Sequence, residues 1–322
     1  MASLEKKHEK NPVSVRLVRQ LSDFIDRIAV FVLVLLCAYG IYGMWDTNQV
    51  LSSAQSSNLQ QYKPEGNDAL SFQELKKINL EVIAWLTVYG TKIDYPITQA
   101  DNDQKYVNTD VMGKYSLSGS IFLSSENTAD FSDFNSIIYG HHMDKEAMFG
   151  GLDKFRGKKY FDQHQYGNLH YGEKDYGIEF FAFIKADAYD WQLYNPGIQE
   201  IAARESYLSY LTEQANQTRS IQVNPEDRIV LLSTCASEPT NGRHILVGKL
   251  HDEPFADPFY EKKEEKPFLG IDLQSWWKKI KRIPTWLVAL LLICWIVVLI
   301  LWFLKRRGRE ENKQNDEKSL DE

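Results

Sequence analysis

The chain has only three cysteines among 322 residues. Cys37 and Cys294 lie within long apolar runs, where a thiol behaves as a small apolar group. Cys235 is therefore the one cysteine in the polar part of the sequence, and it has no partner there for a disulfide bond. A lone cysteine of this kind is either a buried, inert thiol or a free, reactive one.

The sequence also lacks an excess of basic charge. It has 37 Lys and Arg against 44 Asp and Glu, a formal net charge of −7, so no nucleic-acid partner is expected. The CxxC and HxxxH spacings of common metal sites are absent as well. A metal site built from His141, His142 and Cys235 therefore has little support, and no metal or organic cofactor is expected.

Charged residues are missing altogether from residues 28–45 and 286–304. At about 1.5 Å per residue, helices of this length cross the hydrocarbon core of a bilayer. Trp45, Trp286 and Trp302 lie near the ends of the two runs, where amphipathic rings favour the membrane interface. Both runs are therefore predicted to be transmembrane helices.

Each run has an alternative interpretation. Residues 28–45 could be a cleavable signal peptide, although they start late in the chain and no small-x-small cleavage site follows. Residues 286–304, followed by a basic tail, resemble a cell-wall sorting signal. That signal needs a Leu-Pro-x-Thr-Gly-type motif upstream, whereas residues 282–286 read only RIPTW. Plain anchors are favoured in both cases.

The flanking charges predict the orientation of the chain. Six basic residues precede the first run, whereas no Lys or Arg follows it until Lys63. The positive-inside rule places the N-terminus in the cytoplasm, and a second span returns the chain to that side. Residues 46–282 are thus predicted to be extracellular, and both termini cytoplasmic.

The extracellular part reads mainly as short strands rich in β-branched and aromatic residues. Helices are predicted at 71–79, from a Ser71–Glu74 capping box, and at 198–217. The polar stretch around His164 and His170 is predicted to be a surface loop. We expect a mainly-β fold, a single closed barrel of seven to eight strands with a few helices. The predicted strands are 82–90, 94–99, 119–124, 135–140, 178–189, 227–234 and 244–250.

Cys235 ends one of these strands, and Arg243 begins the next across a short polar loop. If the two strands form a hairpin, the two residues emerge side by side. A guanidinium there would orient a carbonyl group or stabilise its oxyanion. His141 and His142 follow the strand 135–140, also at a barrel rim. Taken singly, however, a buried thiol and a solvated rim charge are the commoner roles of such residues.

Three segments together resemble the sortases, membrane-anchored cysteine transpeptidases of Gram-positive bacteria, and most closely class B. They are residues 81–108, residues 119–152 with the motif YGH, and the motif LLSTC followed by Arg243. With the strand pattern, the resemblance covers residues 70–250. It implies that Cys235 is the nucleophile, His141 the catalytic histidine and Arg243 the catalytic arginine. It also implies that certain residues line the substrate groove, namely Ser233, Tyr139 and Asn102.

The resemblance implies an enzyme that cleaves a C-terminal sorting motif of secreted proteins through a Cys235 thioester and transfers the acyl group to an amine. The acceptor is a cell-wall cross-bridge or a pilin lysine; the second membrane span, more familiar in pilus-building class C enzymes, favours the pilin. A hydrolytic cysteine peptidase and a non-catalytic assembly scaffold on the same barrel stay open as alternatives. The expected organisation is a cytoplasmic segment (1–27), a transmembrane helix (28–45), a stalk (46–69), the catalytic barrel (70–255), a juxtamembrane segment (256–285), a second transmembrane helix (286–304) and a cytoplasmic tail (305–322).

Overall fold

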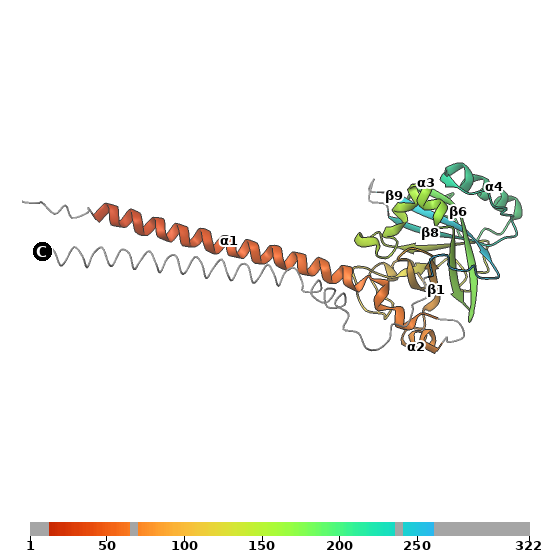
Figure 1. Ribbon diagram of the computed structural model, residues 1–322, viewed down its shortest axis with the longest axis horizontal. Helices are drawn as coiled ribbons and strands as arrows, with labels where there is room; N and C mark the ends of the chain where they lie inside the picture. The colour runs from red at the N-terminus through yellow and green to blue at the C-terminus, as the bar shows by residue number, and fades with distance from the viewer. Residues whose placement is uncertain (1–12, 65–69, 236–240, 261–322) are drawn as a thin grey trace, which may run out of the picture. The chain divides into compact units, whose positions relative to one another are not determined.

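The computed structural model describes residues 13–64, 70–235 and 241–260. These residues fall into two compact units, 13–47 and 48–260. The predicted span at 286–304 and the predicted tail lie outside the described residues. Figure 1 shows the helices and strands in chain order.

The first unit consists of the greater part of helix α1 (Val13–Ser53). Within α1, residues Gln20–Ser53 are long and apolar enough to cross a membrane, judged by length and composition. The most apolar part of this segment is not buried by other parts of the protein. An uncovered apolar helix is consistent with the membrane anchor predicted at 28–45.

The second unit is built on a sheet that contains all nine described strands. Their order is β5-β1-β2-β3-β4-β8-β9-β6-β7, and β5 also pairs with β6. That extra pairing closes eight of the described strands into a barrel, which confirms the predicted closed barrel of seven to eight strands. β7 pairs with β6 outside this ring. The strands are β1 (Val82–Val88), β2 (Asp94–Thr98), β3 (Ile121–Leu123), β4 (Asn135–Gly140), β5 (Tyr166–Tyr171), β6 (Lys174–Asp187), β7 (Ala215–Thr218), β8 (Ile229–Cys235) and β9 (Gly242–His251).

The short helices cover the barrel in places. Figure 1 shows α2 on one side of the barrel, with α3 and α4 on the other. Alternating strand residues fill the interior, where Leu86, Phe180 and Leu246 are fully buried. A second apolar cluster lies beneath α4 and includes Tyr207 and Leu211. The described helices are α2 (Leu70–Ile78), α3 (Lys158–Gln163) and α4 (Ile201–Gln214), with 3₁₀ turns η1 (Ser56–Asn58), η2 (Gln60–Tyr62), η3 (Lys105–Val107), η4 (Asp144–Glu146) and η5 (Gly150–Arg156).

The prediction of a surface loop around His164 and His170 is wrong. Residues 166–171 form β5, which pairs with β1 and β6, and both histidines are buried. The turn between β5 and β6 has Gly172 and Glu173 at φ angles of 54° and 64°. Two consecutive positive φ angles match the twist of a tight hairpin. Because the segment is polar, its sequence suggests a loop and gives no sign of this turn.

The predicted helix at 198–217 is too long at both ends. The helix α4 runs over Ile201–Gln214, and residues 215–218 leave it to form β7 on the edge of β6. The open edge of β6 offers hydrogen-bond partners to the backbone of residues 215–218, and pairing with this edge replaces the last turn of the predicted helix. The helix predicted at 71–79 is confirmed, although it begins at Leu70. Ser71 lies in its first turn and donates a hydrogen bond to the carbonyl of Lys63, so this hydroxyl is not the predicted cap.

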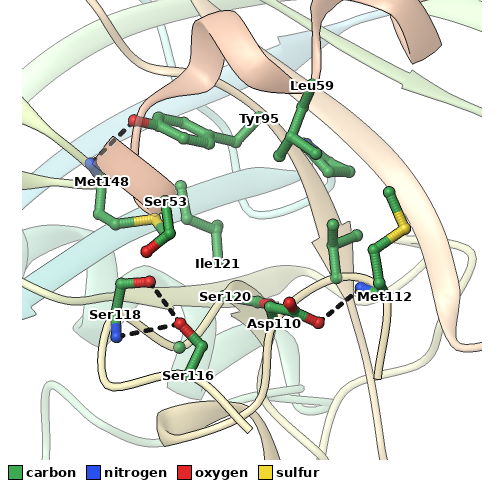
Figure 2. A pocket seen from close by; sticks show the side chains of 13 residues that line it. Ser53, Leu59, Tyr95, Asp110, Met112, Ser116, Ser118, Ser120, Ile121 and Met148 are labelled. Atoms are coloured by element: carbon green, nitrogen blue, oxygen red, sulfur yellow. Dashed lines mark hydrogen bonds between the residues drawn. The ribbon is translucent and has the colours of Figure 1, made fainter. Parts of the chain in front are cut away.

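The segment after α1 is seated on the barrel. Ala54 is buried, and its carbonyl accepts a 2.9 Å hydrogen bond from the hydroxyl of Tyr95 on β2. The same hydroxyl accepts a 3.0 Å hydrogen bond from the backbone N–H of Met148. Figure 2 shows Tyr95 and Met148 beside a cavity of about 80 Å³ whose lining includes Ser53 and Leu59.

Candidate active site

The barrel brings three chain segments to one rim. β4 and β8 are parallel, with Gly140 opposite Thr234, so both strands end at the same edge of the sheet. β8 and β9 are antiparallel, and Cys235 is opposite Arg243. The predicted hairpin is therefore confirmed. The backbones of His141, Cys235 and Arg243 meet at this rim.

A groove with a volume of about 440 Å³ opens at the rim. Strand residues Phe122, Tyr139 and Ser233 line it, together with His141 and Arg243. Two loops complete the lining, with Gln104 and Val107 from one and Ala188 and Tyr194 from the other. The groove is large enough for a few residues of an extended peptide.

His141 is held by backbone groups. Its Nε2 lies 2.8 Å from the carbonyl oxygen of Val107, and because a carbonyl only accepts, Nε2 carries the proton. Its own carbonyl accepts a 3.0 Å hydrogen bond from the N–H of Phe149. The preceding residue must be small, since a Cβ at Gly140 would lie 2.7 Å from the Phe149 ring. The motif YGH thus reflects close packing beneath the histidine.

Arg243 reaches the groove from the start of strand β9, where it is the second residue. Its side chain is partly exposed, and Nη1 donates a 3.0 Å hydrogen bond to the carbonyl of Gly242. The guanidinium has further N–H donors, and Arg243 belongs to the lining of the groove. Such a group suits a carbonyl oxygen that gains negative charge.

Aromatic side chains form one wall of the groove. The rings of Tyr139 and Tyr194 are stacked, with their centroids 6.3 Å apart. The ring of Phe122 packs against Tyr139, with a distance of 5.4 Å between the two ring centroids. The hydroxyl groups of Tyr194 and Ser233 are hydrogen-bonded at 2.9 Å. Burial raises the pKa of Tyr139, assisted by the charge of Asp103, so this phenol stays neutral. The wall is therefore uncharged and suited to apolar parts of a peptide.

The residues predicted to line the substrate groove divide into two groups. Ser233 and Tyr139 lie in the lining, whereas the described lining includes Asp103 and Gln104 and does not include Asn102. The side-chain oxygen of Asn102 instead accepts hydrogen bonds from the backbone of Gln104 and Lys105. Asn102 therefore shapes the loop beside the groove.

The sequence did not indicate Tyr194 or Phe122, since neither follows a motif. Tyr194 lies 39 residues from the serine it contacts, in a loop without periodicity. Asp153 was also missed; it contacts the histidines that follow His141 and Arg243. Among the described residues, no group of three or more His, Cys, Asp and Glu side chains is arranged to hold a metal ion.

No family model matches the chain. It is 34% identical over 180 residues to sortase B of Listeria monocytogenes, covering 55% of this chain and 73% of that protein. The crystal structure of sortase B from the type II pilus of Streptococcus pneumoniae is 43% identical, with a TM-score of 0.51. That match covers 56% of this chain and 99% of the solved one.

A class B sortase of Streptococcus pyogenes involved in pilus biogenesis is 41% identical, with a TM-score of 0.52. It matches 56% of this chain and 97% of the solved chain. The barrel, the groove and these similarities define a sortase-type cysteine transpeptidase. The chain belongs to the sortase B family.

Proposed function

We propose that the enzyme cleaves a C-terminal sorting motif of secreted proteins and transfers the new acyl end to an amine. The observation that carries this proposal is the meeting of His141, Cys235 and Arg243 at one groove rim. In the proposed roles, Cys235 is the nucleophile, His141 the acid and base, and Arg243 the group that holds the reacting carbonyl. Ser233 and Tyr139 contact the peptide in the groove.

Acylation begins when the thiol of Cys235 passes its proton to His141 and the sulfur attacks the carbonyl carbon at the cleavage site. A C–S bond forms, and the carbonyl oxygen gains negative charge beside the guanidinium of Arg243. The C–N bond then breaks, and the leaving amine takes a proton from His141. The product is a thioester on Cys235, with the C-terminal part of the substrate released as an amine.

Transfer reverses these steps with a different amine. His141 removes a proton from the incoming amine, whose nitrogen attacks the thioester carbonyl. The C–S bond breaks, an amide forms, and the departing sulfur of Cys235 takes that proton back from His141, which restores the starting state. Water in place of the amine would give hydrolysis, the activity of the alternative peptidase.

For the acceptor we propose a lysine of a pilin subunit in preference to a cell-wall amine. Support comes from the two relatives at 43% and 41% identity, which are described as belonging to a type II pilus and to pilus biogenesis. The same sequence similarity extends over nearly the full length of both solved chains.

The proposed organisation places the barrel domain (70–255) outside the cell membrane. Support comes from α1, which contains an apolar stretch long enough to cross a bilayer. Residues 286–304 would form the second span and return the tail (305–322) to the cytoplasm. Anchoring confines enzyme and substrate to one surface, which raises their effective concentration.

The test uses the full chain in nanodiscs, incubated with candidate sorting-motif peptides and two competing amines. One amine is a lysine-containing peptide and the other is triglycine. Mass spectrometry should find a Cys235 thioester and a peptide joined to the lysine side chain, and Cys235→Ala should form neither. Free carboxylate as the sole product with both amines present would favour the peptidase. Absence of cleavage and of labelling by a thiol-reactive peptidyl probe would favour the scaffold.

A further inference from the structure

Asp153 lies between two histidines that adjoin the proposed catalytic residues. Its Oδ2 accepts a 2.8 Å hydrogen bond from Nε2 of His142, which directly follows His141. Its Oδ1 accepts a 2.5 Å hydrogen bond from Nδ1 of His244, which directly follows Arg243. One carboxylate thus joins the segment that carries the histidine to the strand that carries the arginine.

The position of Asp153 is itself well fixed. It lies on the turn η5, whose Leu152 and Phe155 are fully buried in the barrel core. η5 packs closely beneath the preceding loop, since a Cβ at Gly150 would lie 2.0 Å from the carbonyl oxygen of Met143. The carboxylate is therefore presented from a rigid part of the fold.

The protonation states of Asp153 and His244 fit the hydrogen bonds between them. Burial raises the pKa of Asp153, but the hydrogen bonds from His142 and His244 outweigh it, so the pKa lies below its usual value. Burial lowers the pKa of His244, opposed by Asp153 and assisted by Lys185 and Arg156. With its pKa lowered, the ring of His244 is neutral at pH 7.5, and its proton lies on Nδ1 because the facing carboxylate oxygen of Asp153 only accepts. Its Nε2 is buried and has no hydrogen-bond partner in the described part of the chain.

The loop after His141 needs such support. Lys145, Glu146 and Met148 all have positive φ angles, 57°, 64° and 50°, which are uncommon for residues with a Cβ. The β8–β9 hairpin holds Cys235 and Arg243 in register through the sheet, whereas the histidine loop leaves the sheet after Gly140. The carboxylate of Asp153 ties this loop back to β9.

We propose that Asp153 is a positioning residue, which fixes His141 relative to Arg243 by holding His142 and His244. The proposal rests on the proposed function, since it concerns the geometry of that active site. Asp153 does not belong to the described lining of the groove, so it acts through its two partners. A misplacement of about 1 Å of a reacting group costs up to about 10²-fold in rate, and this sets the scale of the effect.

Asp153→Asn tests the bridge because asparagine has the same shape but only one acceptor oxygen and no charge. For the full chain in nanodiscs with a cleaved motif peptide, kcat should fall about 10- to 100-fold while KM stays within about threefold. Asp162→Asn is the control: this exposed carboxylate on α3 pairs with Lys158, and its loss should leave both constants unchanged. An unchanged kcat for Asp153→Asn would overturn the proposal.

A pair of substitutions at His142 covers the case that Asp153→Asn does not fold. The amide nitrogen of glutamine can occupy the place of Nε2, whereas leucine has no donor. His142→Gln should therefore retain much more of kcat than His142→Leu at similar melting temperatures. Equal losses in the two variants would contradict a role for the hydrogen bond to Asp153.

A spectroscopic measurement separates this proposal from the proposed function. With ¹⁵N-labelled imidazole rings, His244 should show the neutral Nδ1–H tautomer at pH 7.5 and lose it in Asp153→Leu, whose side chain has no acceptor. If the wild-type chain cleaves no motif peptide, the proposed function fails, whereas the tautomer still decides whether Asp153 holds the ring. A wild-type Nε2–H tautomer would overturn the bridge.

Discussion

Arg243 offers a planar fork of donors to the groove, and the shape of this fork distinguishes it from a simple positive charge. Lysine would keep the charge but replace the fork with a mobile ammonium group. We therefore expect Arg243→Lys to lower kcat/KM for a motif peptide by about 10²–10³-fold, the effect of losing one oxyanion donor. Kinetic assays with a thermal melt as folding control measure this.

Arg243→Ala should be at least as damaging as Arg243→Lys. If Arg243→Lys kept near-normal activity, the residue would act only through its charge on the Cys235 sulfur. The fork would then have no part in holding the carbonyl.

The sequence predicted which residues approach the rim but not how they are supported. His141, Cys235 and Arg243 each stand next to an apolar strand, so local patterns indicate their positions. Asp153 contacts His244 across 91 residues of sequence, and no local pattern encodes such a contact. Supporting residues depend on tertiary packing, which propensity and periodicity do not describe.

At the scale of elements, the barrel strands with β-branched composition could be predicted, whereas β5 and β7 could not. β5 has a polar sequence, yet its backbone pairs with β1 on one side and β6 on the other. Its His170 is buried, with Nδ1 3.0 Å from a carboxylate oxygen of Asp175 on β6. A partner strand thus determined the structure of a segment whose own residues suggest a loop.

The hydroxyl of Tyr95 joins two elements that are distant in sequence, the turn after α1 and the loop after His141. Tyr95→Phe would leave the carbonyl of Ala54 and the N–H of Met148 without this partner. We expect a loss of about 1–3 kcal/mol in the free energy of unfolding, measured by chemical denaturation. Tyr189→Phe is the matched control, since Tyr189 is 79% exposed and should change nothing. Equal stability of the two variants would show that the Tyr95 hydroxyl is dispensable.

For the whole molecule, stability should fall in two steps as the pH is lowered. Folded His244 has a pKa below the ordinary 6.5, so the unfolded chain binds this proton first once the pH passes below about 6.5. Each such proton costs at most about 1.4 kcal/mol per pH unit. The second step comes below about pH 4, where carboxylates with lowered pKa values lose their hydrogen bonds. These include Glu81, Glu146, Asp153 and Asp175.

Thermal melts of the full chain between pH 8 and pH 3 would resolve the two steps. His244→Asn removes the first group and should flatten the profile between pH 7 and pH 5 while leaving the acidic step in place. A wild-type melting temperature that stays constant down to pH 5 would contradict the contribution of His244.

The parallel pairing of β4 with β8 has a consequence for how the enzyme matures. About ninety residues separate the paired positions, so this contact closes a long loop and forms late in folding. β9 then pairs with both β8 and β6 and completes the ring. Because synthesis proceeds from the N-terminus, the thiol of Cys235 leaves the ribosome before Arg243 does. A truncated intermediate that ends before β9 therefore lacks part of the groove rim, and in the proposed mechanism its Cys235 sulfur has no arginine beside it.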